Sequence, residues 1–184
     1  MRKAALALAA ACAPLAAAAG PFEGVRKIKL LDGRSAAIEV GEIAFSPAAA
    51  EGAAAYRIEW LDEPFADHFL SMRPFKCLEG PGKHWCRAPY PYENRREVRE
   101  GDLTDLEYDL LFVWKGAGEY GIDMWNGVYY RLAVEGDRIV GRLNEIDLDR
   151  LSAPPPPGEL RPVRAQDLEE GDPDGHWLPA LVIE

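Results

Sequence analysis

The chain is poor in the residues that build catalytic and metal centres. Its 184 residues include three Cys and three His, and Ser occurs only at positions 35, 46, 71 and 152. No Ser stands in a G-x-S-x-G nucleophile motif. The three His show neither H-E-x-x-H nor another paired-ligand spacing. The sequence therefore predicts no catalytic residue, no metal site and no cofactor, and leaves a site assembled from distant residues as the enzymatic alternative.

Basic residues are also scarce. The chain has 21 Lys and Arg against 31 Asp and Glu, which gives a net charge of −10. Binding to nucleic acid or to an anionic membrane surface needs Lys and Arg, so the acidic balance argues against both partners. With 48% hydrophobic and 10% aromatic residues, a packed core is expected. The length suits one domain, or one domain with an extra lobe.

Long hydrophobic runs are absent after residue 19, so we expect a soluble mature chain without a membrane span. The first 19 residues have the pattern of a secretory signal peptide. Arg2 and Lys3 are followed by an apolar run over 4–15 and by small residues over 16–19. A membrane span would need about 20 apolar residues. We predict cleavage after Ala19, with Ala18 as the alternative, and a periplasmic or secreted protein.

Cysteine use fits this compartment. Cys12 falls inside the predicted signal peptide, and Ala9 stands where a lipobox would carry a branched apolar residue, so lipid attachment at Cys12 is the minor alternative. Cleavage leaves 19 bases against 31 acids, a net charge of −12. Cys77 and Cys86 remain, and they are predicted to form a disulfide across the turn at 80–82. A loop this short contributes about 2.5–3 kcal/mol in the chain-entropy model.

The body of the chain alternates apolar and polar residues with a period of two, which predicts antiparallel strands. The pattern covers 56–60, and it covers 38–45 with a phase slip at Gly41 that suggests a β-bulge. It recurs over 106–114, where Thr104 to Glu107 also fit a helix-starting capping box. We choose a strand there because Tyr, Phe, Val and Trp favour strands. The predicted class is all-β, either an antiparallel calycin-like barrel or a sandwich.

Two hairpins are predicted between 119 and 148. Gly136-Asp137 suits a type II′ turn, and the resulting register places compatible residues opposite each other on one face. Asn126-Gly127 suits a type I′ turn. The pairs expected around the first turn are Val134 with Ile139, Leu132 with Gly141, and Tyr130 with Leu143.

These registers define a candidate ligand site. Arg131 faces Arg142, and like charges placed directly opposite need a compensating group. Asp123 would face Tyr130 across the second hairpin, so both faces are mixed, as in a barrel that holds a small ligand. The alternative is that both Arg lie in solvent and pair with the surplus carboxylates. The candidate ligand-binding residues are Asp123, Trp125, Tyr129, Tyr130, Arg131 and Arg142.

A second candidate site is the segment 83–96, which is locally basic in an acidic chain. Pro89 and Pro91 hold it extended, and we expect an ordered, partner-facing surface loop anchored by the disulfide. The alternative is a long connection whose Arg residues pair with acids over 102–107. The candidate partner-binding residues are His84, Trp85, Arg87, Tyr90, Tyr92, Arg95 and Arg96.

The predicted domain organisation has three parts. Residues 1–19 form the signal peptide, and 20–153 form the antiparallel β domain. The four prolines at 154–157 begin a Pro-rich linker and a C-terminal tail, 154–184, which docks on the β domain with one late strand over 177–183.

Two segments carry a resemblance. Residues 69–92, with SMRPFKCLEG at 71–80, and the motif GDLTDLEYD at 101–109 resemble uncharacterised exported bacterial proteins. This resemblance extends over Val25 to Ala153 and implies no particular activity. The predicted hairpin from Trp125 to Leu148 resembles the small calycin barrels, which include the lipocalins, and implies a ligand-binding barrel.

Three functions are compatible with the sequence. The first is an exported, non-enzymatic protein that binds a small ligand or an envelope component. The second is a protein–protein interaction module, or an inhibitor of a basic envelope enzyme. The third is a hydrolase with a dispersed site, which requires His68, His84 or His176 near a nucleophile or a metal.

Overall fold

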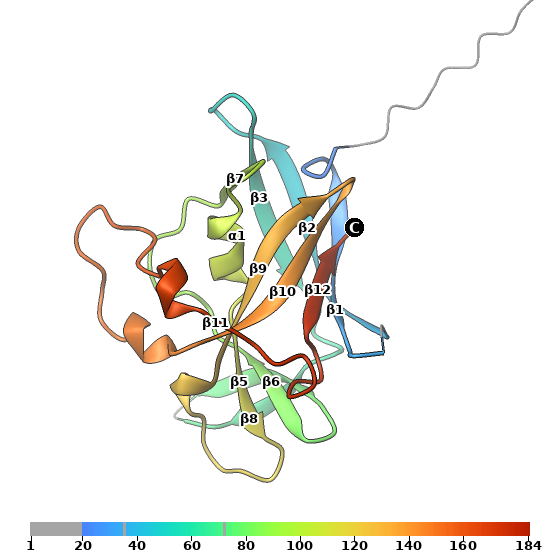
Figure 1. Ribbon diagram of the computed structural model, residues 1–184, viewed down its shortest axis with the longest axis vertical. Coiled ribbons are helices and arrows are strands. Elements are labelled where there is room, and N and C mark those ends of the chain that lie inside the picture. Colours follow the sequence, from blue (N-terminus) through green and yellow to red (C-terminus); the bar gives the residue numbers. More distant parts are fainter. Residues whose placement is uncertain (1–19, 35, 72) are drawn as a thin grey trace, which may run out of the picture.

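A computed structural model describes residues 20–34, 36–71 and 73–184; the predicted signal segment 1–19 and Cys12 lie outside them. The described residues form an antiparallel sheet of order β4-β5-β6-β8-β9-β10-β12-β1-β2-β3-β7, with β11 paired to β10 (Figure 1). The all-β prediction is confirmed. The elements are β1 (Val25–Leu31), β2 (Ala37–Pro47), β3 (Ala53–Trp60), β4 (Ala66–Phe69), β5 (Pro74–Glu79), β6 (Lys83–Arg87), β7 (Glu97–Arg99), α1 (Thr104–Asp109), β8 (Phe112–Gly116), η1 (Met124–Asn126), β9 (Gly127–Glu135), β10 (Arg138–Ile146), η2 (Leu148–Leu151), η3 (Ala165–Asp167), β11 (Glu169–Glu170) and β12 (Ala180–Ile183).

The sheet is open. β4 and β7 stand at opposite ends of the strand order, and no ladder joins them in the described part of the chain. A closed calycin-like barrel is therefore not formed, whereas the sandwich alternative fits. Side chains from both halves of the sheet share one core, in which Ile28 and Ile43 pack with Leu78, Trp85 and Phe112. No helix among the described residues is long and apolar enough to cross a bilayer.

The hairpin of β9 and β10 has the predicted register. Val134 pairs with Ile139 and Tyr130 with Leu143, and Gly136 adopts the positive φ, 67°, that its turn requires. The bulge predicted near Gly41 is also present, because the β1–β2 register shifts between Ile28 and Lys29. Period-two alternation and turn chemistry are local signals, and they locate these features correctly.

The second predicted hairpin was wrong. Met124–Asn126 form the 3-10 turn η1, and Gly127 begins β9 with φ −68°, so no type I′ turn forms at 126–127. β9 pairs with β8 instead, through Phe112 with Val128. Gly127 is needed for close packing, since a Cβ there would lie 2.3 Å from the carbonyl oxygen of Ile146. The predicted pairing of Asp123 with Tyr130 is therefore absent.

The strand predicted over 106–114 was wrong in its first half. Thr104–Asp109 form helix α1, and β8 begins at Phe112. The helix follows Leu103 without a side-chain cap, so packing rather than a capping box holds it. Leu106 lies in the main core and Tyr108 in a second apolar cluster. A short helix buried on two sides carries apolar residues at positions that also fit a strand.

The C-terminal strand lies inside the sheet. β12 pairs with β10 through Ile139–Ile183 and with β1 through Ile28–Ile183. Figure 1 shows β12 between β10 and β1. The tail predicted to dock on the β domain therefore supplies an interior strand, and it joins strands that are far apart in sequence.

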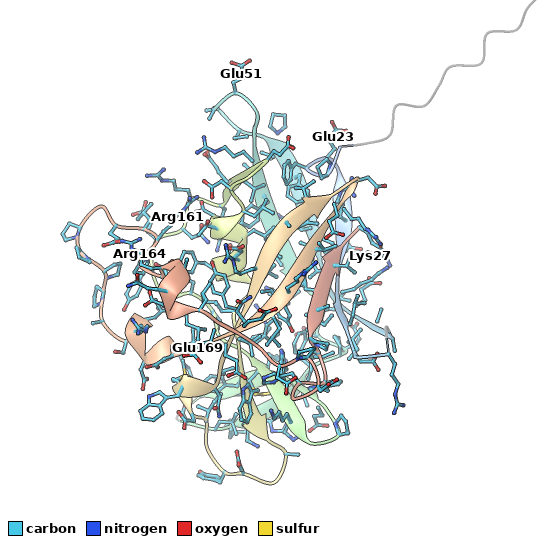
Figure 2. The ribbon with its side chains drawn as sticks, viewed as in Figure 1. Glu23, Lys27, Glu51, Arg161, Arg164 and Glu169 are labelled. Atoms are coloured by element: carbon cyan, nitrogen blue, oxygen red, sulfur yellow. A yellow bond between two sulfur atoms is a disulfide. The ribbon has the colours of Figure 1, made fainter. Side chains whose placement is uncertain are left out.

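Arg161 anchors the tail to helix α1. Its Nε donates to Asp105 Oδ1 at 2.7 Å, and its Nη1 lies 2.9 Å from Asp102 Oδ2. Figure 2 shows Arg161 and Arg164 on the tail beside α1. The alternative hypothesis from the sequence was that the Arg residues of 83–96 form ion pairs with these acids. Instead Arg96 pairs with Asp109, at 3.2 Å.

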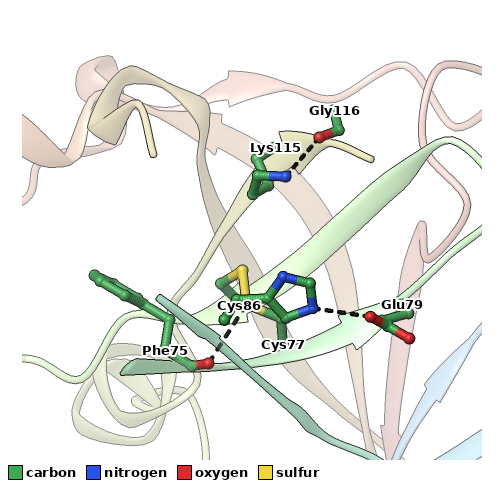
Figure 3. The surroundings of a disulfide bond; sticks show 7 residues. Phe75, Cys77, Glu79, Cys86, Lys115 and Gly116 are labelled. Atoms are coloured by element: carbon green, nitrogen blue, oxygen red, sulfur yellow. Dashed lines mark hydrogen bonds and ion pairs between the residues drawn. A yellow bond between two sulfur atoms is a disulfide. The ribbon is translucent and has the colours of Figure 1, made fainter. Parts of the chain in front are cut away.

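The predicted disulfide is present. Cys77 and Cys86 are bonded and fully buried, and they stand opposite each other in the β5–β6 ladder. The turn expected at 80–82 connects the two strands. Figure 3 shows the bond with Phe75, Glu79 and Lys115 around it. A buried disulfide is compatible with an oxidising, extracytoplasmic compartment.

Candidate functional site

The candidate ligand residues do not surround one cavity. Arg131 and Arg142 face each other across β9 and β10 as predicted, and both are exposed. Asp123 is exposed and its carboxylate caps η1 by accepting from the Trp125 backbone N–H. The Trp125 side chain is 68% exposed, and its Nε1 donates to Asp149 at 2.8 Å.

The two tyrosines of this set are buried. Tyr130 OH accepts a hydrogen bond from Trp85 Nε1 at 3.1 Å and donates to the Leu178 carbonyl at 2.8 Å. Tyr129 OH donates to Glu107 at 2.5 Å. Burial raises the pKa of both phenols and of Glu107, so all three groups keep their protons more firmly than in water. These contacts tie β9 to the core and to α1.

The segment 83–96 divides into two parts. Residues 83–87 form strand β6 inside the sheet, with Trp85 fully buried. The surface loop predicted over 83–96 is therefore wrong for this half. The other half, 88–96, runs over the surface. Its rings are anchored, because Tyr90 stacks on Tyr108 at 4.5 Å and Tyr92 OH donates to the Leu151 carbonyl.

Three adjoining depressions follow the end of β6 and the segment after it. The first has a volume of about 500 Å³, with Arg73, Lys76 and Arg87 on its walls. The second, of about 250 Å³, shares Arg73 and Pro89 with the first. The third, of about 240 Å³, shares Arg87 and Pro89. Since Pro89 lines all three, we call them together the Pro89 cleft.

Arg87 is the unusual group of the Pro89 cleft. Its guanidinium lies over the Trp60 ring at 3.9 Å, and its Nε is buried without a hydrogen-bond partner. No carboxylate of the described residues forms an ion pair with it at 4.0 Å or less. Burial lowers the pKa of Arg87 to about 10, against a small opposing effect of the Asp62 charge. The cleft therefore contains a partly desolvated cation that still needs an acceptor.

The other cations of the cleft are not all alike. Lys76 lies 3.2 Å from Asp67, and Arg96 has Asp109 as its partner. Arg73, by contrast, has no ion-pair partner among the described residues. Arg95, a candidate in the sequence, is exposed and lines none of the three depressions. The structure thus selects Arg87 from the predicted set and adds Arg73.

The second depression is mostly apolar. Its walls come from β5, from the segment after β6, from α1's end and from η1 and η2. Of these walls, the sequence pointed only to the segment after β6, because the others join it only through the chain's tertiary path. The walls include Phe75, Ala88, Leu111, Met124, Leu148 and Leu151.

A separate cluster lies on β4, β5 and β6. His68 Nε2 is 2.9 Å from Glu79 Oε1, and the His84 ring is 5.0 Å from the His68 ring. Burial lowers the pKa of His84, and the charges of His68 and Lys115 act in the same direction while Glu79 opposes them. The register was available in the sequence, because Cys77 opposite Cys86 places Glu79 opposite His84.

The third histidine stands apart. His176 is 5% exposed, and its Nε2 contacts Glu145 Oε1 at 2.5 Å. Its ring packs edge-on against Trp85 and Trp114. Within the described residues, the His68 side chain contacts the Glu79 carboxylate and the His176 side chain contacts the Glu145 carboxylate. Neither contact supplies the nucleophile that the hydrolase hypothesis requires.

Comparisons with known proteins identify no relative. No family model, no curated protein and no solved structure matches this chain. The resemblance to exported bacterial proteins and to calycin barrels thus stays a prediction.

Proposed function

We propose that the protein is an exported, non-enzymatic binding protein whose ligand is a small amphiphilic anion held in the Pro89 cleft. The observation that carries this proposal is Arg87, a partly buried guanidinium that forms no ion pair within the described residues and whose Nε lacks a hydrogen-bond partner there, in a chain that has 31 acids against 21 bases. Leaving such a cation unpaired is unfavourable unless a ligand supplies the acceptor.

The headgroup is expected to be a carboxylate or a phosphate. Arg presents a planar fork of N–H donors that matches either group, and Arg73 adds a second cation on the same wall. Trp60 supports the guanidinium from behind, so its plane is held before the ligand arrives. Preorganisation of this kind reduces the entropy lost on binding.

The body of the ligand is expected to be apolar. The second depression adjoins the first through Arg73, Phe75 and Pro89, and Leu148 and Met124 line its far side. The first depression, of about 500 Å³, lies in the range of small-molecule sites, roughly 300–1,000 Å³, and the adjoining second depression adds about 250 Å³. An apolar chain placed there removes hydrocarbon from water while the headgroup stays at Arg87.

Dodecanoate is a suitable probe, with dodecyl phosphate, dodecanol and acetate for comparison. Trp60 is in contact with Arg87, so tryptophan fluorescence, supported by calorimetry, reports occupancy. We expect either amphiphilic anion to bind at least tenfold more tightly than the neutral alcohol or acetate, and the two anions distinguish the headgroups. Equal binding of dodecanol and dodecanoate would contradict an anion site.

The matched variants are Arg87→Met and Arg95→Met. Loss of a charge-assisted hydrogen bond costs about 1.5–3 kcal/mol, so Arg87→Met lowers the affinity for dodecanoate about 10- to 100-fold. Arg95 belongs to the same segment but lines no part of the cleft, and its substitution leaves the affinity unchanged. If both variants bind like the wild type, the cleft is not the ligand site.

The compartment is part of the proposal. The signal pattern over 1–19 and the disulfide Cys77–Cys86 support a periplasmic or secreted protein. Mass spectrometry of the chain from its native cell tests this, and the expected first residue is Gly20, or Ala19 for the alternative cleavage. A chain that retains Met1 in the cytoplasm would refute export.

A further inference from the structure

Three side chains with metal-binding atoms meet beside the disulfide. His68 comes from β4, Glu79 from the end of β5 and His84 from β6. One ligand atom of each lies within 4.8 Å of the other two. The dashed line that ends on Glu79 in Figure 3 marks its 2.9 Å contact with His68 Nε2.

We propose that His68, Glu79 and His84 bind a divalent transition-metal ion of the zinc type. Two imidazoles and one carboxylate form the three-ligand set of open zinc sites, in which the fourth position is left to water or to another ligand. Ligands about 2.0–2.1 Å from a tetrahedral ion are roughly 3.3 Å apart. Contraction of the cluster by about 1.5 Å at most reaches that geometry, and the exposed Glu79 already contacts His68.

The scaffold holds two of the ligands firmly. Glu79 and His84 are directly opposite in the β5–β6 ladder, two residues from the pair Cys77 and Cys86. The disulfide and the short turn at 80–82 therefore limit how far the two ligands separate. His68 lies on β4, the edge strand, whose ladder with β5 aligns it with Phe75. Preformed ligands on cross-linked strands favour metal binding over a disordered cluster.

His84 has a buried ring nitrogen without a hydrogen-bond partner among the described residues, and a metal ion could bind it. Its side chain is 9% exposed, and its Nδ1 is buried with no hydrogen-bond partner among the described residues. Coordination at Nδ1 would supply the missing partner. Coordination at the other ring nitrogen would fix the tautomer. Either way, an ion would organise a ring that the protein alone leaves without a complete set of partners.

One nearby group opposes a cation. Lys115 faces His84 across β6 and β8, and its buried ammonium donates to the Gly116 carbonyl at 2.7 Å. Removing this charge is expected to tighten metal binding. Because the ion would carry two charges, Coulomb repulsion from one neighbouring unit charge lowers its affinity severalfold even at the dielectric constant of water.

The experiment is a calorimetric titration of the untagged protein with Zn²⁺. Where the protein is produced with residues 1–19 still attached, a Cys12→Ala background removes the thiol outside the disulfide, so that Cys12 does not compete for the metal. We expect one ion per chain. The variants Glu79→Gln and His68→Gln are expected to weaken binding at least 10- to 100-fold, because loss of supporting groups alone has that effect at metal sites.

The control is Glu145→Gln, which removes the charge from the other His–Glu contact by the same substitution. It leaves Zn²⁺ affinity unchanged, and Lys115→Met raises it severalfold. Zn²⁺ binding that is absent, or that is equal in Glu79→Gln and the wild type, would overturn the proposal. Circular dichroism and thermal melts of each variant separate lost binding from lost folding. The proposal is independent of the anion cleft, since none of its ligands lines that cleft.

Discussion

Replacing Arg161 by Met tests how the C-terminal tail is fixed to the body of the protein. Arg161 is about one-third exposed, but the Asp105 side chain that it contacts is only 4% exposed. Met keeps the apolar stem and removes the charge, so Asp105 would remain as a buried carboxylate. Its other hydrogen bond, from the Glu97 backbone N–H at 3.3 Å, is too long to replace the guanidinium.

The magnitude follows from burial. Breaking a fully buried ion pair costs about 3–5 kcal/mol because one charge is left without a partner. Solvent reaches Arg161 and, at 25% exposure, Asp102, so we reduce this to about 2–3 kcal/mol of unfolding free energy. Urea denaturation at pH 7 measures it. The control is Arg164→Met, an exposed Arg on the same segment, for which we expect about 0.5 kcal/mol or less.

The pH dependence gives an independent test. Burial raises the pKa of Asp102, but the hydrogen bond and charge of Arg161, with the Thr104 N–H, outweigh burial and hold the pKa below its usual value. A carboxyl with a depressed folded pKa stabilises above its unfolded value, about 3.9, and this stability is lost as pH falls through the folded pKa. The difference between wild type and variant should therefore shrink towards pH 3.

A double-mutant cycle with Asp105→Asn completes the test. Adding Asp105→Asn to Arg161→Met removes the unpaired charge, so we expect the two substitutions to be non-additive by about 2 kcal/mol. The reasoning is refuted if Arg161→Met costs no more than Arg164→Met, or if its cost is the same at pH 3 and pH 7.

Two further predictions concern the scaffold. Replacing Cys77 and Cys86 together by Ala opens a loop of sequence separation 9, and the chain-entropy model predicts a loss of about 2.6 kcal/mol in the free energy of unfolding. Urea denaturation measures this loss. A smaller loss would show that the unfolded chain keeps this loop short even without the disulfide. Gly127→Ala places a Cβ 2.3 Å from the Ile146 carbonyl oxygen, so we expect it to lower the free energy of unfolding by about 2–3 kcal/mol, measured by thermal or urea unfolding. The control is Gly82→Ala, whose Cβ would meet nothing within 4 Å, and we expect a change of about 0.5 kcal/mol or less. Equal effects of the two substitutions would refute the packing argument.

The candidate sites were only partly predictable. The 83–96 segment drew attention through its local charge, and it supplies Arg87, but the sequence could not show that Trp85 is core while Arg87 lies in a cleft. The residues that complete the cleft, such as Phe75 and Leu148, come from distant parts of the chain. Arg131 and Arg142 are paired as predicted, yet both are exposed, because the hairpin register does not say which face of the sheet is covered.

The sequence could have placed two of the three proposed metal ligands next to each other. Treating Cys77 and Cys86 as a cross-strand pair places Glu79 opposite His84, and this relation needs the sequence alone. His68 could not be added in the same way, because its position depends on how β4 pairs with β5.

The sequence by itself determined the all-β class, the β9–β10 register and the disulfide. Each of these depends on neighbours within about ten residues, where period-two alternation, turn residues and short loops act directly. Tertiary structure alone decided that Thr104–Asp109 are helical, that Gly127 is a packing position and that β12 lies between β10 and β1. These outcomes depend on which surfaces are buried against each other, and burial between distant segments overrides local propensity.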